Sequence, residues 1–226
     1  MDESRGAARP QALTIRVISV VTVHGLWMRG ASMALLRRRL EPHGFQIYEF
    51  TYPSVRQTLT ANAAALAAFV AATPGHTVHL IGHSLGGVVI REMLESRDAR
   101  SARVGRVVCL GSPLRGSRTA ARLARLPGGR YAIGKGIAEL NERGGFTAWV
   151  AGSEAGSIAG RVPFGLGRLF GPFREPNDGT VAVAETRVDG ADHVVLPVSH
   201  FAFLWSKRVA EQIEHFLLHG RFSGAA

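Results

Sequence analysis

The sequence contains a single cysteine among its 226 residues. One cysteine excludes a disulfide bond within the chain, and it leaves no metal cluster held by cysteine thiolates. Because Cys109 stands in the apolar run 107–110, we expect a buried structural thiol and not a reactive one.

The sequence also lacks an apolar run long enough to cross a membrane. The run at 15–23 is too short for a transmembrane helix, and we interpret it as a buried strand. The polar residues before it show neither the cationic start nor the small-residue cleavage site of a signal peptide. We therefore expect a cytoplasmic protein with a flexible segment at 1–14 and a single domain at 15–222.

Lysine is scarce, and Lys135 and Lys207 are the only two. The net charge of +10 therefore comes from arginine, and ten arginines lie between residues 91 and 130 against three acidic residues. Such a segment is typical either of a solvated surface or of a surface attracted to anions. Three of these arginines, Arg118, Arg122 and Arg125, share helical spacing, so peripheral contact with an anionic membrane stands as an alternative to a solvated helix face. No motif that reads nucleic acid is present, and we expect no nucleic-acid partner.

Apolar runs typical of strands alternate with runs of helical spacing along the chain. This order predicts an α/β fold with a mostly parallel, doubly wound sheet of about six strands flanked by helices. Trp205 is expected among the buried residues of the last helix. Strands are predicted at 15–23, 45–52, 77–81, 104–110, 147–153 and 191–197, and helices at 32–40, 55–72, 87–96, 117–126, 130–142 and 201–218.

Ser84 is the candidate nucleophile. It stands in Gly82-His83-Ser84-Leu85-Gly86, between an apolar strand-like run and a run of helical spacing. A sharp turn from strand to helix exposes such a serine, and small residues two positions away on either side let strand and helix approach closely. The alternative is a glycine-rich turn needed only for packing.

A serine nucleophile needs a base and a carboxylate that orients the base. His200 follows the last predicted strand, where ligands bind in such sheets, whereas His193 stands at the start of that strand. Asp178 lies on a turn before an apolar run, and the order Ser84, Asp178, His200 is that of the α/β-hydrolase arrangement. The competing carboxylates are Glu175, Asp189 and Asp192.

The oxyanion hole is assigned to two main-chain N–H groups. His24-Gly25 closes the first predicted strand, so the N–H of Leu26 is one candidate, and Leu85 after the nucleophile is the other. Each such donor contributes about 3 kcal/mol to the stabilisation of the transition state.

Together these motifs resemble those of α/β-hydrolases of the bacterial lipase and esterase type. The resemblance covers about residues 15–220 and rests on His-Gly at 24–25, Gly-His-Ser-Leu-Gly-Gly at 82–87, Asn-Asp-Gly-Thr-Val at 177–181 and Ser-His at 199–200. The stretch 111–117 is similar to the family's Gly-Thr-Pro-His-x-Gly-Ser, although Leu114 stands where the family usually has histidine. The short chain leaves room for a small cap at most, with residues 114–145 as the candidate cap or lid, and no calcium site is evident.

The resemblance implies hydrolysis of carboxylic esters through an acyl-enzyme on Ser84, with no cofactor and no metal. We expect a small-molecule or lipid ester as substrate. The apolar, glycine-punctuated stretch 161–173 is a candidate wall of an acyl pocket through Phe164, Leu166 and Leu169, with a buried loop as the alternative, and Trp27 is a candidate for the entrance. Two other functions stay open: a thioesterase or acyltransferase with the same triad, and a non-catalytic protein that binds membrane or nucleic acid.

Overall fold

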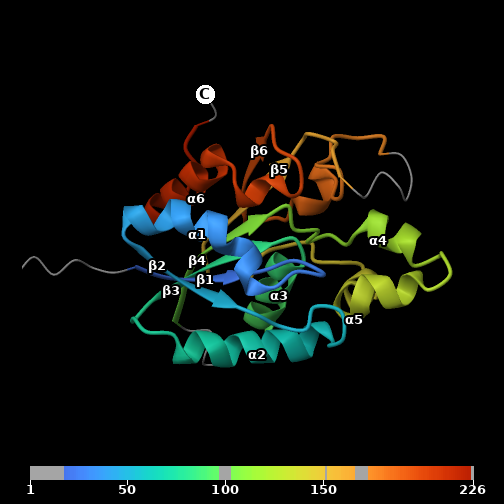
Figure 1. Cartoon of the computed structure of the whole chain (residues 1–226), viewed down its shortest axis with the longest axis horizontal. Helices are drawn as coiled ribbons and strands as arrows, with labels where there is room; N and C mark the ends of the chain where they lie inside the picture. Colours follow the sequence, from blue (N-terminus) through green and yellow to red (C-terminus); the bar gives the residue numbers. More distant parts are fainter. Residues whose placement is uncertain (1–17, 97–102, 151, 166–172, 225–226) are drawn as a thin grey trace, which may run out of the picture.

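The structure is a computed structural model that describes residues 18–96, 103–150, 152–165 and 173–224 (Figure 1). Within these residues a six-stranded parallel sheet runs in the order β2-β1-β3-β4-β5-β6, which confirms the predicted α/β architecture. The strands are β1 (Ile18–Val23), β2 (Phe45–Phe50), β3 (Val78–His83), β4 (Val104–Leu110), β5 (Ala155–Gly160) and β6 (Asp192–Leu196). The helices are α1 (Ala34–Leu40), α2 (Leu59–Ala72), α3 (Leu85–Glu95), α4 (Arg118–Leu123), α5 (Gly129–Glu142) and α6 (Lys207–His219).

Helices cover both faces of the sheet. Figure 1 shows α1 and α6 on one face and α2 and α3 on the other. Successive side chains of a strand point to opposite faces, so Val20 of β1 packs with α1 and α6 while Val21 and Val23 pack with α2 and α3. A strand buried on both faces does not alternate apolar and polar residues, and the two polar residues of β1, Ser19 and Thr22, are buried with hydroxyl groups that donate to main-chain carbonyls.

The fifth strand is not where the sequence predicts it. The predicted strand 147–153 is wrong, because its described residues, 147–150 and 152–153, lie outside the sheet and Ala148 forms only an isolated bridge with Asp189. The strand is instead Ala155–Gly160, which consists of small residues apart from Ile158 and is buried along its whole length. Small residues are needed there because an added Cβ at Gly156 would lie 2.8 Å from the ring of Phe216 in α6.

Two helices begin later than predicted, and a polar residue marks each start. The side chain of Thr58 accepts a hydrogen bond from the N–H of Ala61, which makes it the N-cap of α2. Ser206 caps α6 in the same way. The predicted burial of Trp205 is therefore wrong, since this residue precedes the helix and is 48% exposed.

The carboxyl ends of the strands face α4 and α5, which follow β4 in the chain (Figure 1). These two helices account for most of the segment 114–145 that the sequence indicates as a cap. In the part of the chain that the structure describes, none of the helices combines the length and the apolar character that crossing a bilayer requires.

Candidate active site

Ser84 occupies the sharp turn between β3 and α3. Its backbone is held at φ 53° and ψ −122°, a conformation that costs a residue with a side chain about 1–3 kcal/mol. The N–H of Ser84 donates to the carbonyl of Leu110 at the end of β4, at 2.9 Å. The glycines of the motif are needed sterically, because an added Cβ at Gly82 or Gly86 would overlap backbone atoms of Gly87 or Val23.

His200 lies four residues after the end of β6 and is paired with Asp178. The distance between His200 Nδ1 and Asp178 Oδ2 is 2.7 Å, and both side chains are buried. Asp178 Oδ1 accepts hydrogen bonds from the N–H groups of Thr180 and Val181 at 2.9 and 2.7 Å. A carboxylate held in this way accepts from Nδ1–H of the imidazole, which leaves Nε2 free to accept a proton.

The competing residues have other partners. Glu175 pairs with Arg118, and Asp192 accepts from the N–H of Phe222. His193 lies near the start of β6, where its ring contacts Thr186. Burial lowers the pKa of His193 to about 4, so it is neutral at pH 7. Among the candidate acids, Asp178 is the one that contacts His200.

His83 supports the main chain of His200. Its Nε2–H donates to the carbonyl of His200 at 3.0 Å, and the two ring centroids are 4.9 Å apart. Burial lowers the pKa of His83 to about 3, so the ring is neutral and carries its proton on Nε2. The N–H of His200 donates in turn to the carbonyl of Asp178 at 2.8 Å. Both the N–H and the C=O of His200 are therefore bonded.

The loop after β1 is anchored by His24. The His24 ring stacks on Tyr52 with centroids 4.4 Å apart, and its Nε2 accepts from the Tyr52 N–H at 3.3 Å. The Tyr52 hydroxyl donates to the His24 carbonyl at 2.9 Å. Burial lowers the pKa of His24, which keeps its ring neutral and suits it to this anchoring role.

One assigned oxyanion donor shares a cavity with Ser84, and the other follows Ser84 in the chain. Leu26 follows the anchored His-Gly pair and lines the same cavity as Ser84. Leu85 is the first residue of α3, so its N–H has no acceptor within the helix. The assignment of the oxyanion hole to these two N–H groups stays a prediction.

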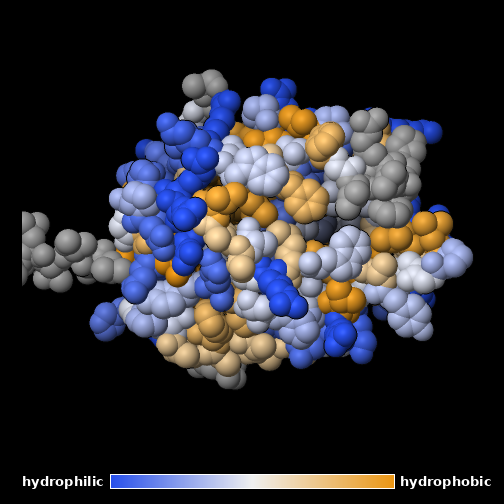
Figure 2. Space-filling model, viewed as in Figure 1, coloured by the Kyte–Doolittle hydropathy of each residue, from blue (hydrophilic) through white to orange (hydrophobic). Residues whose placement is uncertain are grey.

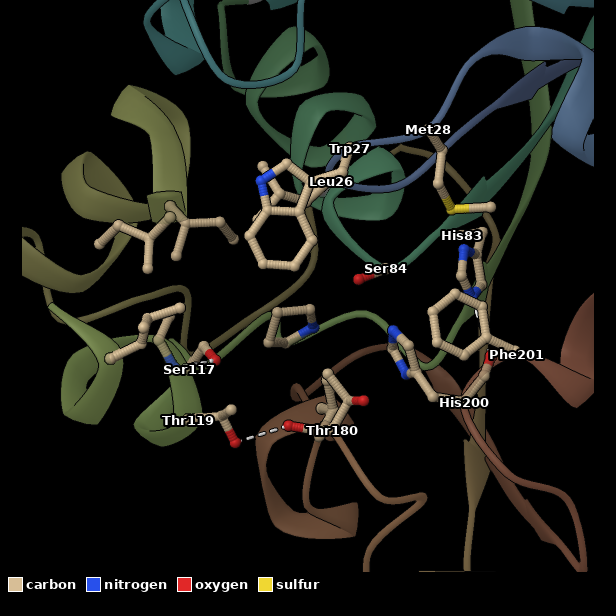
Figure 3. Close-up of a pocket in the computed structure, with 16 residues that line it drawn as sticks. Leu26, Trp27, Met28, His83, Ser84, Ser117, Thr119, Thr180, His200 and Phe201 are labelled. Atoms are coloured by element: carbon tan, nitrogen blue, oxygen red, sulfur yellow. Dashed lines mark hydrogen bonds between the residues drawn. The ribbon is translucent and has the colours of Figure 1, made fainter. Parts of the chain in front are cut away.

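A cavity that is partly open to solvent lies at this site. Ser84, His83 and His200 lie in its wall together with Leu26 and Trp27 (Figure 3). In the space-filling view the surface is hollowed beside α4, where hydrophobic residues gather (Figure 2).

The rest of the cavity wall differs from the prediction. Phe164 is not among the lining residues and is 77% exposed, while Leu166 and Leu169 lie outside the described residues. Among the described residues, the apolar wall comes from the α4 and α5 segment. The prediction did not include this segment in the wall, although the helical spacing of 117–126 and 130–142 was a signal for it. The main apolar residues of this wall are Ala120, Leu123, Ile133 and Ile137.

No cation site and no thiol nucleophile is evident among the described residues. Within them, His, Cys, Asp and Glu side chains do not gather in groups of three or more that suit a metal ion. Burial raises the pKa of Cys109 to about 12, so its thiol stays protonated at pH 7. The polar groups at the cavity include a serine hydroxyl and an imidazole that is paired with a buried carboxylate, a set suited to nucleophilic attack on a carbonyl.

The comparisons with known proteins agree with this fold. The model of the alpha/beta hydrolase family matches residues 20–215. Among solved structures, Bacillus licheniformis lipase BlEst2 in its mature form has a TM-score of 0.68 and 20% identity over 90% of this chain and 91% of its own. The metagenomic carboxyl esterase MGS0156 has a TM-score of 0.62 and 20% identity over 90% of this chain and 74% of its own.

Aspergillus fumigatus lipase B has a TM-score of 0.65 and 15% identity over 89% of this chain and 52% of its own. At such identities the likeness establishes the shared fold. A search of curated protein sequences gives no match.

Proposed function

Because the chain belongs to the alpha/beta hydrolase family, we propose that it is a serine hydrolase that cleaves carboxylic esters through an acyl-enzyme on Ser84. One observation carries the proposal. The imidazole of His200, oriented by a hydrogen bond to buried Asp178, lines the same cavity as the strained Ser84. Strain of this kind persists where the surrounding structure holds it, and it concentrates at functional sites.

Acylation uses these groups in order. Ser84 Oγ attacks the ester carbonyl carbon as His200 Nε2 takes the hydroxyl proton, which gives a tetrahedral intermediate. Its oxyanion accepts hydrogen bonds from the N–H groups of Leu26 and Leu85. The C–O bond to the alcohol then breaks, and His200 returns its proton to the leaving oxygen. Asp178 keeps its hydrogen bond to Nδ1 and stabilises the imidazolium.

Deacylation repeats the steps with water in place of serine. His200 Nε2 takes a proton from water as the water oxygen attacks the acyl carbon. When the intermediate collapses, the bond to Ser84 Oγ breaks and the proton returns to that oxygen. A carboxylic acid leaves and the free enzyme is restored.

The lining of the cavity favours binding of an apolar acyl group of the substrate. Its α4 and α5 wall consists mainly of alanine, leucine and isoleucine, with little polar surface to hydrate a charged chain. The names of the similar structures, lipase and carboxyl esterase, agree with an ester substrate. We therefore propose small acyl or acyl-lipid esters as substrates.

The test is hydrolysis of p-nitrophenyl esters from acetate to palmitate by the wild type, Ser84→Ala and Ser96→Ala. Ser96 ends the helix that Ser84 precedes, so Ser96→Ala is a matched control outside the cavity. We expect Ser84→Ala to lose at least about 10⁴-fold in kcat while Ser96→Ala keeps wild-type activity. Absence of ester hydrolysis by the wild type, or retained activity in Ser84→Ala, would refute the proposal. Acyl thioesters assayed in parallel distinguish an esterase from a thioesterase.

A further inference from the structure

The backbone of Trp27 has a positive φ, which is unfavourable for a residue with a bulky side chain. Its φ is 59°, and in the described part of the chain Trp27 and Ser84 are the two residues other than glycine with positive φ. A bulky residue in this region is a strained outlier. Each of the two is adjacent to an assigned oxyanion donor, since Leu26 precedes Trp27 and Leu85 follows Ser84. An outlier of this kind points to a functional constraint.

Two hydrogen bonds hold Trp27 in this conformation. Its main-chain N–H donates to the hydroxyl of buried Ser54 at 3.2 Å. Its indole Nε1–H donates to the main-chain carbonyl of Ala132 in α5 at 2.9 Å. The indole is 57% exposed, so burial in a core does not fix its orientation. The two hydrogen bonds are the directional contacts that do.

The acceptor in α5 is available because the helix is interrupted. Gly134 has φ 73° and ψ 163°, which is not helical. The first turn of α5 therefore ends before Gly134, and its carbonyls lack regular helical donors. One of them, Ala132, accepts from Trp27 instead.

The interrupted segment of α5 packs against residues 54–55, and Ser54 is the residue that accepts the hydrogen bond from the Trp27 main-chain N–H. The N–H of Lys135 donates to the carbonyl of Val55 at 3.1 Å. Gly134 packs so closely there that an added Cβ would lie 2.8 Å from Val55 Cα. Hydrogen bonds therefore connect Trp27 both to Ser54 and to α5, and α5 is bonded in turn to Val55. Trp27 directly follows Leu26, so it joins these contacts to the loop that contains Leu26. Figure 3 shows the indole in the wall of the cavity that holds Ser84.

We propose that Trp27 is a positioning residue whose two hydrogen bonds hold the N–H of Leu26 toward the cavity, so that the oxyanion hole depends on α5 being seated against residues 54–55. The proposal rests on the proposed function and names a residue that controls it. Trp27 then does more than form the entrance to the cavity. It couples the α5 segment to the stabilisation of the transition state.

The experiment compares Trp27→Phe with Trp205→Phe. Both changes remove an indole N–H from a partly exposed tryptophan, but Trp205 does not line the cavity. Complete loss of an oxyanion donor lowers kcat by about 10²–10³-fold. For a displaced donor we expect Trp27→Phe to lower kcat by about 10- to 100-fold with KM within about twofold, and Trp205→Phe to leave both unchanged.

A second readout separates positioning from a structural role. A trifluoromethyl ketone forms a tetrahedral adduct with a nucleophilic serine and places an oxyanion in the hole. Its inhibition constant for Trp27→Phe should rise by the factor that kcat/KM falls. Ser54→Ala removes the acceptor of the Trp27 N–H and leaves the indole in place, and it should also lower kcat. This variant replaces Trp27→Phe in the experiment if Trp27→Phe does not fold.

The outcomes distinguish this inference from the proposed function. If the wild type hydrolyses esters and Ser84→Ala does not, but Trp27→Phe changes KM alone or changes nothing, the positioning role is overturned and the proposed function stands. If Ser84→Ala retains activity, both are overturned. A parallel loss in kcat and in affinity for the ketone supports the inference.

Discussion

Replacement of Asp178 by asparagine tests the orientation of the base. Asp178 Oδ1 accepts from two main-chain N–H groups, those of Thr180 and Val181, and Oδ2 faces His200 Nδ1. In Asp178→Asn the amide oxygen has to take the Oδ1 position, because an NH₂ group there would face two buried donors. The NH₂ group is then directed at His200 Nδ1.

An NH₂ donor facing Nδ1 favours the tautomer of His200 that carries its proton on Nε2. Nδ1 becomes the acceptor, so the ring proton moves to Nε2, which then cannot take the proton of Ser84. The same change in an enzyme with this triad lowers kcat by about 10⁴-fold, equivalent to about 5.5 kcal/mol in the activation free energy. We expect a loss of this size with KM little changed and with the fold intact.

The assay is the steady-state hydrolysis of a p-nitrophenyl ester, with circular dichroism to verify folding. Asp189→Asn is the matched control, because Asp189 is exposed and lies on the turn before β6. It should keep wild-type kcat. A folded Asp178→Asn protein with more than a tenth of wild-type kcat, or an equal loss in Asp189→Asn, would refute the reasoning.

Three further predictions follow from the packing and burial at the site. Gly86→Ala places a Cβ against the Val23 carbonyl and should destabilise the fold by about 1–3 kcal/mol in urea denaturation, whereas Gly136→Ala, with its nearest neighbours 3.8 Å away, should be tolerated. Burial holds the pKa of His83 at about 3, below its ordinary value of 6.5. The unfolded chain therefore binds more protons between these values, so the free energy of unfolding should rise with pH across this window by up to about 1.4 kcal/mol per pH unit, with a smaller slope in His83→Gln. Ile137→Ala should shift the kcat/KM optimum toward longer acyl esters and Ile137→Phe toward shorter ones, because Ile137 lines the cavity; an unchanged chain-length profile in both would exclude this wall from acyl binding.

The parts of the fold that follow from local pattern could be predicted from the sequence. A continuous β-branched run predicts β1, and the strand-like and helical runs on either side of Ser84 predict the turn that holds it. The pairing of Asp178 with His200 was also accessible, because His200 follows the last strand-like run and the chain order Ser84, Asp178, His200 is that of the α/β-hydrolase arrangement.

The parts that depend on tertiary packing could not be predicted. β5 is built of alanine, glycine and serine apart from Ile158, and its two glycines are packed closely against Phe216 and Phe203 from the C-terminal region. β-propensity instead favoured 147–153, whose tryptophan and valine pack outside the sheet. The link from Trp27 to Ala132 joins residues far apart in the sequence and leaves no trace in local spacing.

Labelling with a fluorophosphonate, followed by mass spectrometry of the peptides, tests the central claim most directly. The reagent forms a stable adduct with a serine hydroxyl that an adjacent base activates. We expect a single modified peptide carrying the adduct on Ser84, and no labelling of Ser84→Ala. An unlabelled wild-type protein, or an adduct on another residue that persists in Ser84→Ala, would contradict it.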